Sequence, residues 1–271
     1  MKNILLLILM ALVTLSACKE KEIAIPELSV GDKKVIVEEL TGVRCTACPD
    51  GARLLEQLQE TYGENLIVVS IHEAPDFSVP YDESAYDFRT VKGKELFDFI
   101  GVYEGVPAAS IARFQPPNYI TPFVTVKSFW PGFVATELSK DYGLGLFVKN
   151  DYDPATRKLD VLVNIAPGQD IDGDNRLTVV ITQDSIVDRQ LDNNVLIEDY
   201  VHRHVLREVL TKASGDDITE PLTSGALISR NFSMTLPADW VAEHCSVVAY
   251  VHHTGTPDKI VLQAAEEHVV E

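Results

Sequence analysis

Residues 33–63 read KKVIVEELTGVRCTACPDGARLLEQLQETYG, and this stretch decides the fold of the first half of the chain. Its β-branched start predicts a buried strand, and the leucines near its end recur at helical spacing up to Gly63, which predicts a helix. The apolar run NLIVVSIH at 65–72 is typical of a strand buried on both faces. Strand, helix and strand in this order predict a right-handed parallel unit.

Two cysteines, Cys45 and Cys48, lie between the predicted strand and the predicted helix. A thiol at a helix N-terminus faces the positive end of the helix dipole, which stabilises the thiolate, the attacking species. A cysteine one turn further along can resolve a mixed disulfide. Arg44 adds a cation, which is expected to lower the thiol pKa. The pair could instead stay closed as a structural disulfide, and the spacing leaves both possibilities open.

The first residues indicate export. Lys2 is followed by an apolar run at 4–15 that is shorter than the about 20 residues needed to span a bilayer, and then by LSAC. Small residues leading into a cysteine resemble a lipobox, which implies cleavage before Cys18 and lipid attachment to its sulfur. We predict a signal peptide at 1–17, a charged tether at 18–32 and an oxidising environment for the thiols.

The length and composition of the chain, and the change in its pattern of apolar residues from Gly143 onward, predict two globular domains. The chain has 271 residues, 46% of them hydrophobic, and a net charge of −18, which argues against nucleic acid or an anionic lipid surface as partner. From Gly143 onward, short alternating runs separated by turns predict an antiparallel β-sandwich. We therefore expect domains at 33–141 and 142–271, with a polar, aromatic insertion in the first near 75–92.

Other candidate sites are weaker. The cysteine pair and His72 lack the fourth ligand of a zinc site, so we predict no metal and no cofactor. DIDGDN at 170–175 resembles part of a calcium loop, but a hairpin turn is the simpler interpretation. The pairs His202/His204 and His252/His253 could form a site, but we expect polar residues satisfied by backbone at a sandwich end. The remaining cysteine, Cys245, precedes an apolar run and is expected to be buried and inert.

The order strand, C-x-x-C, helix, strand, and then VP before a third strand resembles a thioredoxin-like domain. The resemblance implies that Cys45 is the nucleophile, that Cys48 resolves the mixed disulfide, and that Pro107 forms a cis bond facing the cysteines and docks substrate backbone. It also places a buried acid at Glu39, which would relay a proton to Cys48. A carboxylate at the strand edge in water is the alternative for Glu39. The chain departs from the pattern at Arg44, where thioredoxins usually carry tryptophan.

The wider pattern is closer to one group. VEELTGVRCTACPDG, VVSIHEA, GVPAASIARF, DYVHRHVLREVL and VLQAAE together resemble the 28-kDa outer-membrane lipoprotein family of Gram-negative bacteria. The resemblance implies an α/β thioredoxin-like domain followed by an antiparallel, immunoglobulin-like β-sandwich, anchored at the outer membrane through Cys18. Two functions follow as hypotheses. The first is thiol–disulfide exchange with protein thiols and disulfides of the cell envelope, and the second is non-enzymatic binding or adhesion, with the cysteine pair as a structural disulfide.

Overall fold

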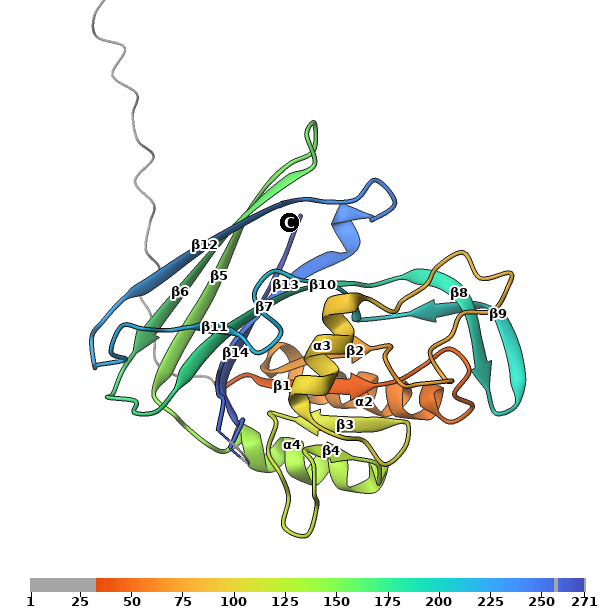
Figure 1. The fold of residues 1–271 in the computed structure, drawn as a ribbon, viewed down its shortest axis with the longest axis horizontal. Helices are drawn as coiled ribbons and strands as arrows, with labels where there is room; N and C mark the ends of the chain where they lie inside the picture. The colour runs from red at the N-terminus through yellow and green to blue at the C-terminus, as the bar shows by residue number, and fades with distance from the viewer. Residues whose placement is uncertain (1–32, 256–257, 271) are drawn as a thin grey trace, which may run out of the picture.

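The computed structural model describes residues 33–255 and 258–270 (Figure 1). The predicted signal peptide, the lipidation site Cys18 and the tether lie outside the described residues. In the part of the chain that is described, no helix has both the length and the apolar character needed to cross a membrane.

A nine-stranded sheet runs through both halves of the chain. Its strands, in spatial order, are β14 (Val261–His268), β13 (Cys245–His253), β7 (Asn175–Gln183), β10 (Val205–Val209), β2 (Leu66–Ile71), β1 (Val35–Leu40), β3 (Ala108–Ile111) and β4 (Phe123–Val124), and β11 (Asp216–Asp217) pairs with β7. All residues of β1 and β2 are buried and the two strands are parallel, which confirms both predicted strands and their parallel pairing.

The two halves meet where β10 pairs with β2, through the parallel partners Val205 and Ser70. The predicted boundary between 141 and 142 falls between α4 (Trp130–Leu138) and β5 (Leu144–Asp153). One apolar cluster contains residues of both halves, among them Ile67 and Tyr250. The sheet and this core therefore join the halves into a continuous structure, whichever way the chain is divided.

The helix that follows the cysteines begins earlier than its leucine pattern indicates. α2 spans Cys48–Tyr62, because Pro49 is suited to the first turn of a helix, where its missing N–H is not needed. Leu55 and Leu58 are buried, and Gly63 ends the helix with a positive φ of 56°. The other helices are α3 (Val91–Ile100), which crosses in front of the sheet in Figure 1, and α4, which packs beside α2. Short 3₁₀ turns lie at Gly63–Asn65, Lys127–Phe129 and Ala242–His244.

The second half is rich in β-structure. A three-stranded sheet of β12 (Ile228–Thr235), β6 (Lys158–Pro167) and β5 packs against the β14-β13-β7 end of the large sheet through a second apolar cluster. The expected antiparallel layers are therefore present, and immunoglobulin-like topology stays a prediction. The hairpin turn expected at 170–175 is wrong: this segment leads from β6 in one sheet to β7 in the other.

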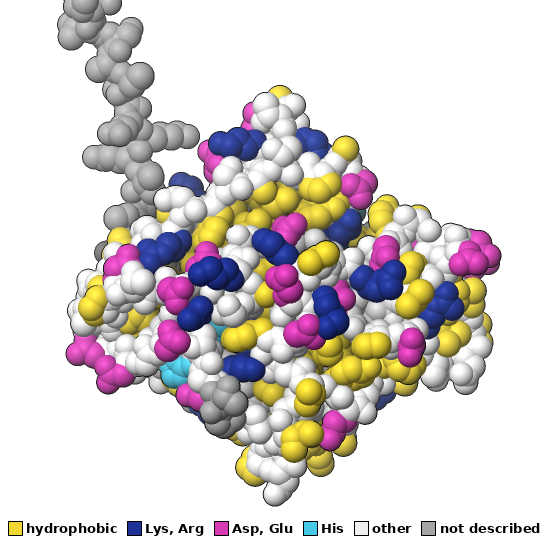
Figure 2. All heavy atoms as spheres, in the orientation of Figure 1, with side chains coloured by type: hydrophobic (Ala, Val, Ile, Leu, Met, Phe, Trp, Pro, Cys, Tyr) yellow, Lys and Arg dark blue, Asp and Glu magenta, His cyan; other side chains and the backbone are white. Residues whose placement is uncertain are grey.

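A separate two-stranded hairpin, β8 (Ile186–Asp192) and β9 (Val195–His202), projects from the second half (right side of Figure 1). Its turn residues Asn193 and Asn194 have φ values of 47° and 63°, which asparagine tolerates better than most residues. On the face drawn in Figure 2, acidic and basic side chains are interspersed, so the net negative charge does not gather there into one acidic patch.

Candidate functional site

Cys45 and Cys48 form a disulfide at the N-terminus of α2, with their Cα atoms 5.4 Å apart. The turn that carries them is closed by main-chain bonds: the Cys45 N–H donates to the Gly42 carbonyl, and the Cys48 N–H to the Cys45 carbonyl. The two cysteines are buried, at 2% and 1% exposure. The sequence expectation of a thiol beside a helix N-terminus therefore holds, but the sulfurs are not open to solvent.

Gly51, one turn into α2, is the point where the surrounding elements converge. A Cβ atom built there would lie 3.1 Å from Glu39 Oε1, from Pro107 Cβ and from the Trp130 ring. Glycine therefore permits α2 to lie against β1, the start of β3 and α4 at once. The peptide bond between Val106 and Pro107 is cis.

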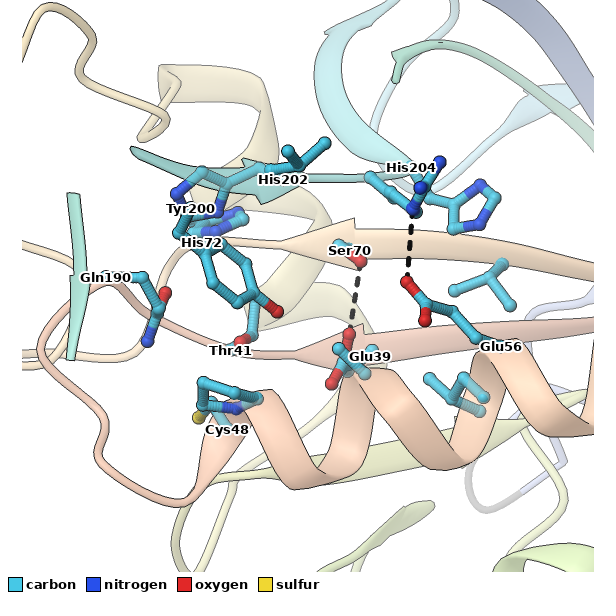
Figure 3. Close-up of a pocket in the computed structure, with 16 residues that line it drawn as sticks. Glu39, Thr41, Cys48, Glu56, Ser70, His72, Gln190, Tyr200, His202 and His204 are labelled. Atoms are coloured by element: carbon cyan, nitrogen blue, oxygen red, sulfur yellow. Dashed lines mark hydrogen bonds and ion pairs between the residues drawn. The ribbon is translucent and has the colours of Figure 1, made fainter. Parts of the chain in front are cut away.

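Glu39 points inward from β1, which excludes the alternative of a carboxylate in water. It is 2% exposed, and its Oε2 accepts a hydrogen bond from Ser70 Oγ at 3.1 Å, as the dashed line in Figure 3 shows. Its Oε1 has no hydrogen-bond partner among the described residues. Burial raises the pKa of Glu39 to about 8, against the smaller opposing effect of the Ser70 hydrogen bond. The carboxyl group can thus hold or release a proton near neutral pH.

A cavity of about 30 Å³ connects Glu39 to the disulfide (Figure 3). Cys48 and Glu39 line it together with His72, directly after β2, and Tyr200 and His202 from β9. The ring centroids of the two histidines are 5.8 Å apart. Burial lowers their pKa values, to about 3 for His72 and about 4 for His202, so both rings are neutral.

The contact between His72 and His202 corrects the sequence interpretation. His202 was expected among polar residues at a sandwich end, but it is buried beside His72 from the first half. His72 Nδ1 and His202 Nε2 have no hydrogen-bond partner within the described residues. His252 is also buried, and its Nε2 lies 2.8 Å from Thr178 Oγ1. No cluster of three or more His, Cys, Asp or Glu side chains that could hold a metal ion occurs among the described residues.

Arg44 ties the predicted insertion to the cysteine turn. Its guanidinium donates to the carbonyl oxygens of Val79 and Pro80, both at 2.7 Å, and lies 4.3 Å from the centre of the Tyr81 ring. Residues 72–90, all of them described, carry neither helix nor strand. Arg44 therefore anchors this irregular segment, and its expected effect on the thiol pKa stays a prediction.

The second half contributes contacts to the cysteine turn that the motifs do not indicate. The Leu191 N–H donates to the Val43 carbonyl at 2.8 Å, and the Asn193 N–H to the Thr46 carbonyl at 3.0 Å. Gln190 Nε2 donates to the carbonyls of Cys45 and Gly42, at 3.2 and 3.3 Å. The Asn-Asn pair between two strand-like runs is a sequence signal for this hairpin, but its placement against residues 43–46 is a long-range contact that no local signal reports.

Cys245 is the free cysteine of the described chain, and it is buried as predicted. Its Sγ lies 3.3 Å from the Val241 carbonyl, to which it donates. Burial raises the pKa of its thiol to about 12, so the thiolate is scarce at neutral pH. Cys245 is therefore poorly suited to disulfide exchange.

Two solved structures are similar to this chain in fold, and a third matches part of it. HBP35 of Porphyromonas gingivalis is similar with a TM-score of 0.66 and 16% identity, over 88% of this chain and 76% of that one. A structural-genomics target from Agrobacterium tumefaciens is similar with a TM-score of 0.50 and 14% identity, over 89% and 96%. A domain of the outer membrane lipoprotein Omp28 from Porphyromonas gingivalis overlaps 47% of this chain and 88% of its own length, with 19% identity and a TM-score of 0.34.

The sequence itself points to a family. No curated protein sequence matches the chain. The family profile of outer membrane protein Omp28 matches residues 96–270, more than half of the chain. The matched region includes Pro107 and the β8–β9 hairpin and begins after the cysteine pair. The chain therefore belongs to the Omp28 family of outer membrane proteins, which places it at the outer membrane.

Proposed function

We propose that this protein is a thiol–disulfide oxidoreductase of the cell envelope, anchored by lipid on Cys18, and that residues 33–141 form a thioredoxin-like domain. The order of β1, cysteine turn, α2, parallel β2, and then Pro107 before antiparallel β3 supports the domain assignment. One observation carries the activity: the Cys45–Cys48 disulfide lies at a helix N-terminus and shares a cavity with a buried carboxyl group, Glu39.

The proposed exchange reduces a substrate disulfide and oxidises the cysteine pair. In the reduced protein, the Cys45 thiolate attacks one sulfur of a substrate disulfide, that S–S bond breaks, and the leaving thiolate takes up a proton. Glu39, in its deprotonated form, then accepts the proton of the Cys48 thiol, whose sulfur attacks Cys45 Sγ. The S–S bond between Cys45 and the substrate breaks, and the second substrate sulfur leaves as a thiolate that takes up a proton. Two electrons pass from the cysteine pair to the substrate, and a protein dithiol of the envelope restores the pair by the reverse steps.

A second function is favoured by one observation, the burial of both cysteines. In that case the disulfide is a structural link, and the protein is a non-enzymatic binding or adhesion lipoprotein whose second half carries the interaction. The two proposals differ in what the cysteines do in the presence of a protein disulfide, so the same variants separate them.

The test measures exchange between the mature protein and a protein disulfide in a series of redox buffers. Cys45→Ser should abolish exchange, and Cys48→Ser should accumulate mixed disulfides through Cys45, because resolution is lost. Cys245→Ser is the matched control and should leave exchange unchanged, since its buried thiol is outside the site. Absence of exchange by the wild-type protein in every buffer would favour the binding function.

A further inference from the structure

We propose that the β8–β9 hairpin determines which substrates reach Cys45, because it covers the cysteine turn and must swing away before a protein disulfide can approach. This inference rests on the proposed exchange at Cys45. The hairpin would admit small thiol reagents while it is in place, and protein substrates only when its tip is released.

The tip of the hairpin is bonded along the outer side of the cysteine turn. Leu191 and Asn193 donate main-chain hydrogen bonds to the carbonyls of Val43 and Thr46. The Gln190 side chain donates to the Cys45 carbonyl from a position that is 3% exposed. These contacts occupy the main-chain acceptors on either side of Cys45, so a protein segment cannot approach this side of the turn while the tip is bound.

The opposite wall of the cysteine turn is formed by residues 77–80, which lie close against its main chain. The Arg44 N–H donates to the Phe77 carbonyl at 2.8 Å, and a Cβ atom at Gly42 would come within 2.5 Å of the same oxygen. The main chains therefore touch, and Arg44 fastens the segment further through Val79 and Pro80. We therefore infer that the hairpin, rather than residues 77–80, is the wall that opens.

The hairpin is built to move at its tip and to stay fixed at its root. At the root, Ile186 and Val205 are buried in an apolar cluster with Val43 and Phe88. At the tip, the contacts are polar, and they include an ion pair between Arg53 on α2 and Asp192, whose side chains are 45% and 20% exposed. When the tip opens, water can replace its polar contacts, including those of the buried Gln190, whereas opening the root would expose apolar surface. Local opening at the tip is therefore the motion of lower cost.

The β8 and β9 strands also pair only with each other among the described strands. A two-stranded hairpin has little stability of its own in water, so its position depends on contacts with the rest of the chain. These lie at its root, at its tip and between them, where Asp188 accepts from the Tyr86 N–H and Arg189 donates to the Glu83 carbonyl. Weakening the tip contacts should thus raise the population of the open form without unfolding the nine-stranded sheet.

The experiment compares a variant with weakened contacts at the hairpin tip with a matched control variant. The double variant Gln190→Ala/Asp192→Ala removes the glutamine contacts and the Arg53 ion pair. Glu220→Ala removes an arginine ion pair of similar exposure, to Arg230, in the second half. The mature proteins are reduced, and modification of Cys45 by N-ethylmaleimide and by a polyethylene-glycol-linked maleimide is followed by mass spectrometry.

In the wild-type protein, the small reagent should modify Cys45 much faster than the bulky one. The double variant should shrink the ratio of the two rates by about tenfold, because the open form admits the bulky reagent. Glu220→Ala should leave the ratio unchanged. An unchanged ratio in the double variant, or an equal fall in Glu220→Ala, overturns the proposal.

Two further measurements keep the inference separate from the proposed function. Exchange with a protein disulfide should be faster in the double variant than in wild type. If neither protein exchanges while the labelling ratio still falls, the oxidoreductase function is wrong and the hairpin cover stands. If the double variant does not fold, amide hydrogen exchange of wild-type Leu191 and Asn193 decides: both should exchange faster than the amides of β13, and exchange only through global unfolding overturns the proposal.

Discussion

Glu38 and Glu39 are neighbours on β1, and both are buried, yet their surroundings are opposite. Because side chains alternate along a strand, the two carboxyl groups lie on different faces of the sheet. Both oxygens of Glu38 accept hydrogen bonds from Arg113, at 2.6 and 2.8 Å, and Tyr250 OH adds a bond of 3.0 Å. Glu39 has a single hydrogen-bond partner, Ser70, and one oxygen without a partner in the described chain.

This difference separates a structural polar group from a chemically responsive one. The Glu38–Arg113–Tyr250 cluster joins β1 to β13 across the two halves of the chain, and its charges are paired. Glu39 faces the small cavity beside Cys48, where burial without a cationic partner shifts its pKa toward neutrality. Because this pKa lies near neutrality, Glu39 can take up and release a proton beside Cys48, as a proton-transfer group requires.

The largest effect on the free energy of unfolding is expected from removing the charge of Glu38, the carboxyl group that is paired with Arg113. Glu38→Gln leaves Arg113 buried without its counter-charge, and the free energy of unfolding should fall by about 3–5 kcal/mol. Urea denaturation measures it. The double variant Glu38→Gln/Arg113→Met should recover part of the loss, because the uncompensated charge is gone. A loss below about 1 kcal/mol in the single variant would contradict the pairing.

The next effect concerns Glu39, the carboxyl group without a cationic partner among the described residues, and the dependence of stability on pH. The folded-state pKa of Glu39 is raised to about 8 from 4.5, so between these pH values the folded protein holds a proton that the unfolded chain releases. Stability therefore falls as pH rises from 4.5 to 8, by about 4 kcal/mol. Glu39→Gln should flatten this part of the curve relative to wild type in denaturation at pH 5 and pH 8. Identical slopes for the two proteins would show that Glu39 does not titrate as expected.

A smaller effect of opposite sign is expected from the cavity histidines. The pKa of His202 is lowered to about 4 from 6.5, so below pH 6.5 the unfolded chain takes up a proton that the folded protein does not. Stability is lost as pH falls from 6.5 toward 4, by about 2 kcal/mol. His202→Asn should reduce this loss, measured as the difference in unfolding free energy between pH 7 and pH 5. If His202→Asn loses as much unfolding free energy between pH 7 and pH 5 as wild type does, His202 lies in water rather than in the cavity.

The smallest effect tests how closely the elements meet at Gly51. Gly51→Ala should destabilise the protein by about 1 kcal/mol, because crowding against Glu39, Pro107 and Trp130 outweighs the gain in helix propensity. Gly132, in α4, is the matched control: a Cβ atom there meets nothing within 4 Å, so Gly132→Ala should stabilise by about 0.5–1 kcal/mol. Thermal unfolding measures both, and a stabilising Gly51→Ala would contradict the close approach.

Local patterns predicted the elements around the cysteines well. β-branched residues identified β1 and β2, and leucine spacing identified α2 apart from its first turn. Burial of Cys245 also followed from its apolar neighbours. These features depend on residues a few positions apart, where propensity and periodicity act directly. The family resemblance supplied Glu39 and Pro107, which no local spacing would single out.

What the sequence by itself determined is the cysteine turn: its spacing, the strand before it and the helix after it all depend on short-range backbone preferences. Tertiary structure decided its surroundings. Nothing in VEEL tells which glutamate faces Arg113 and which faces the cavity, and nothing near His202 indicates that it meets His72. The β8–β9 hairpin reaches residues 43–46 from about 150 positions away in the chain. Such contacts follow from how the sheet pairs β10 with β2, which depends on packing of the whole core rather than on any local run of residues.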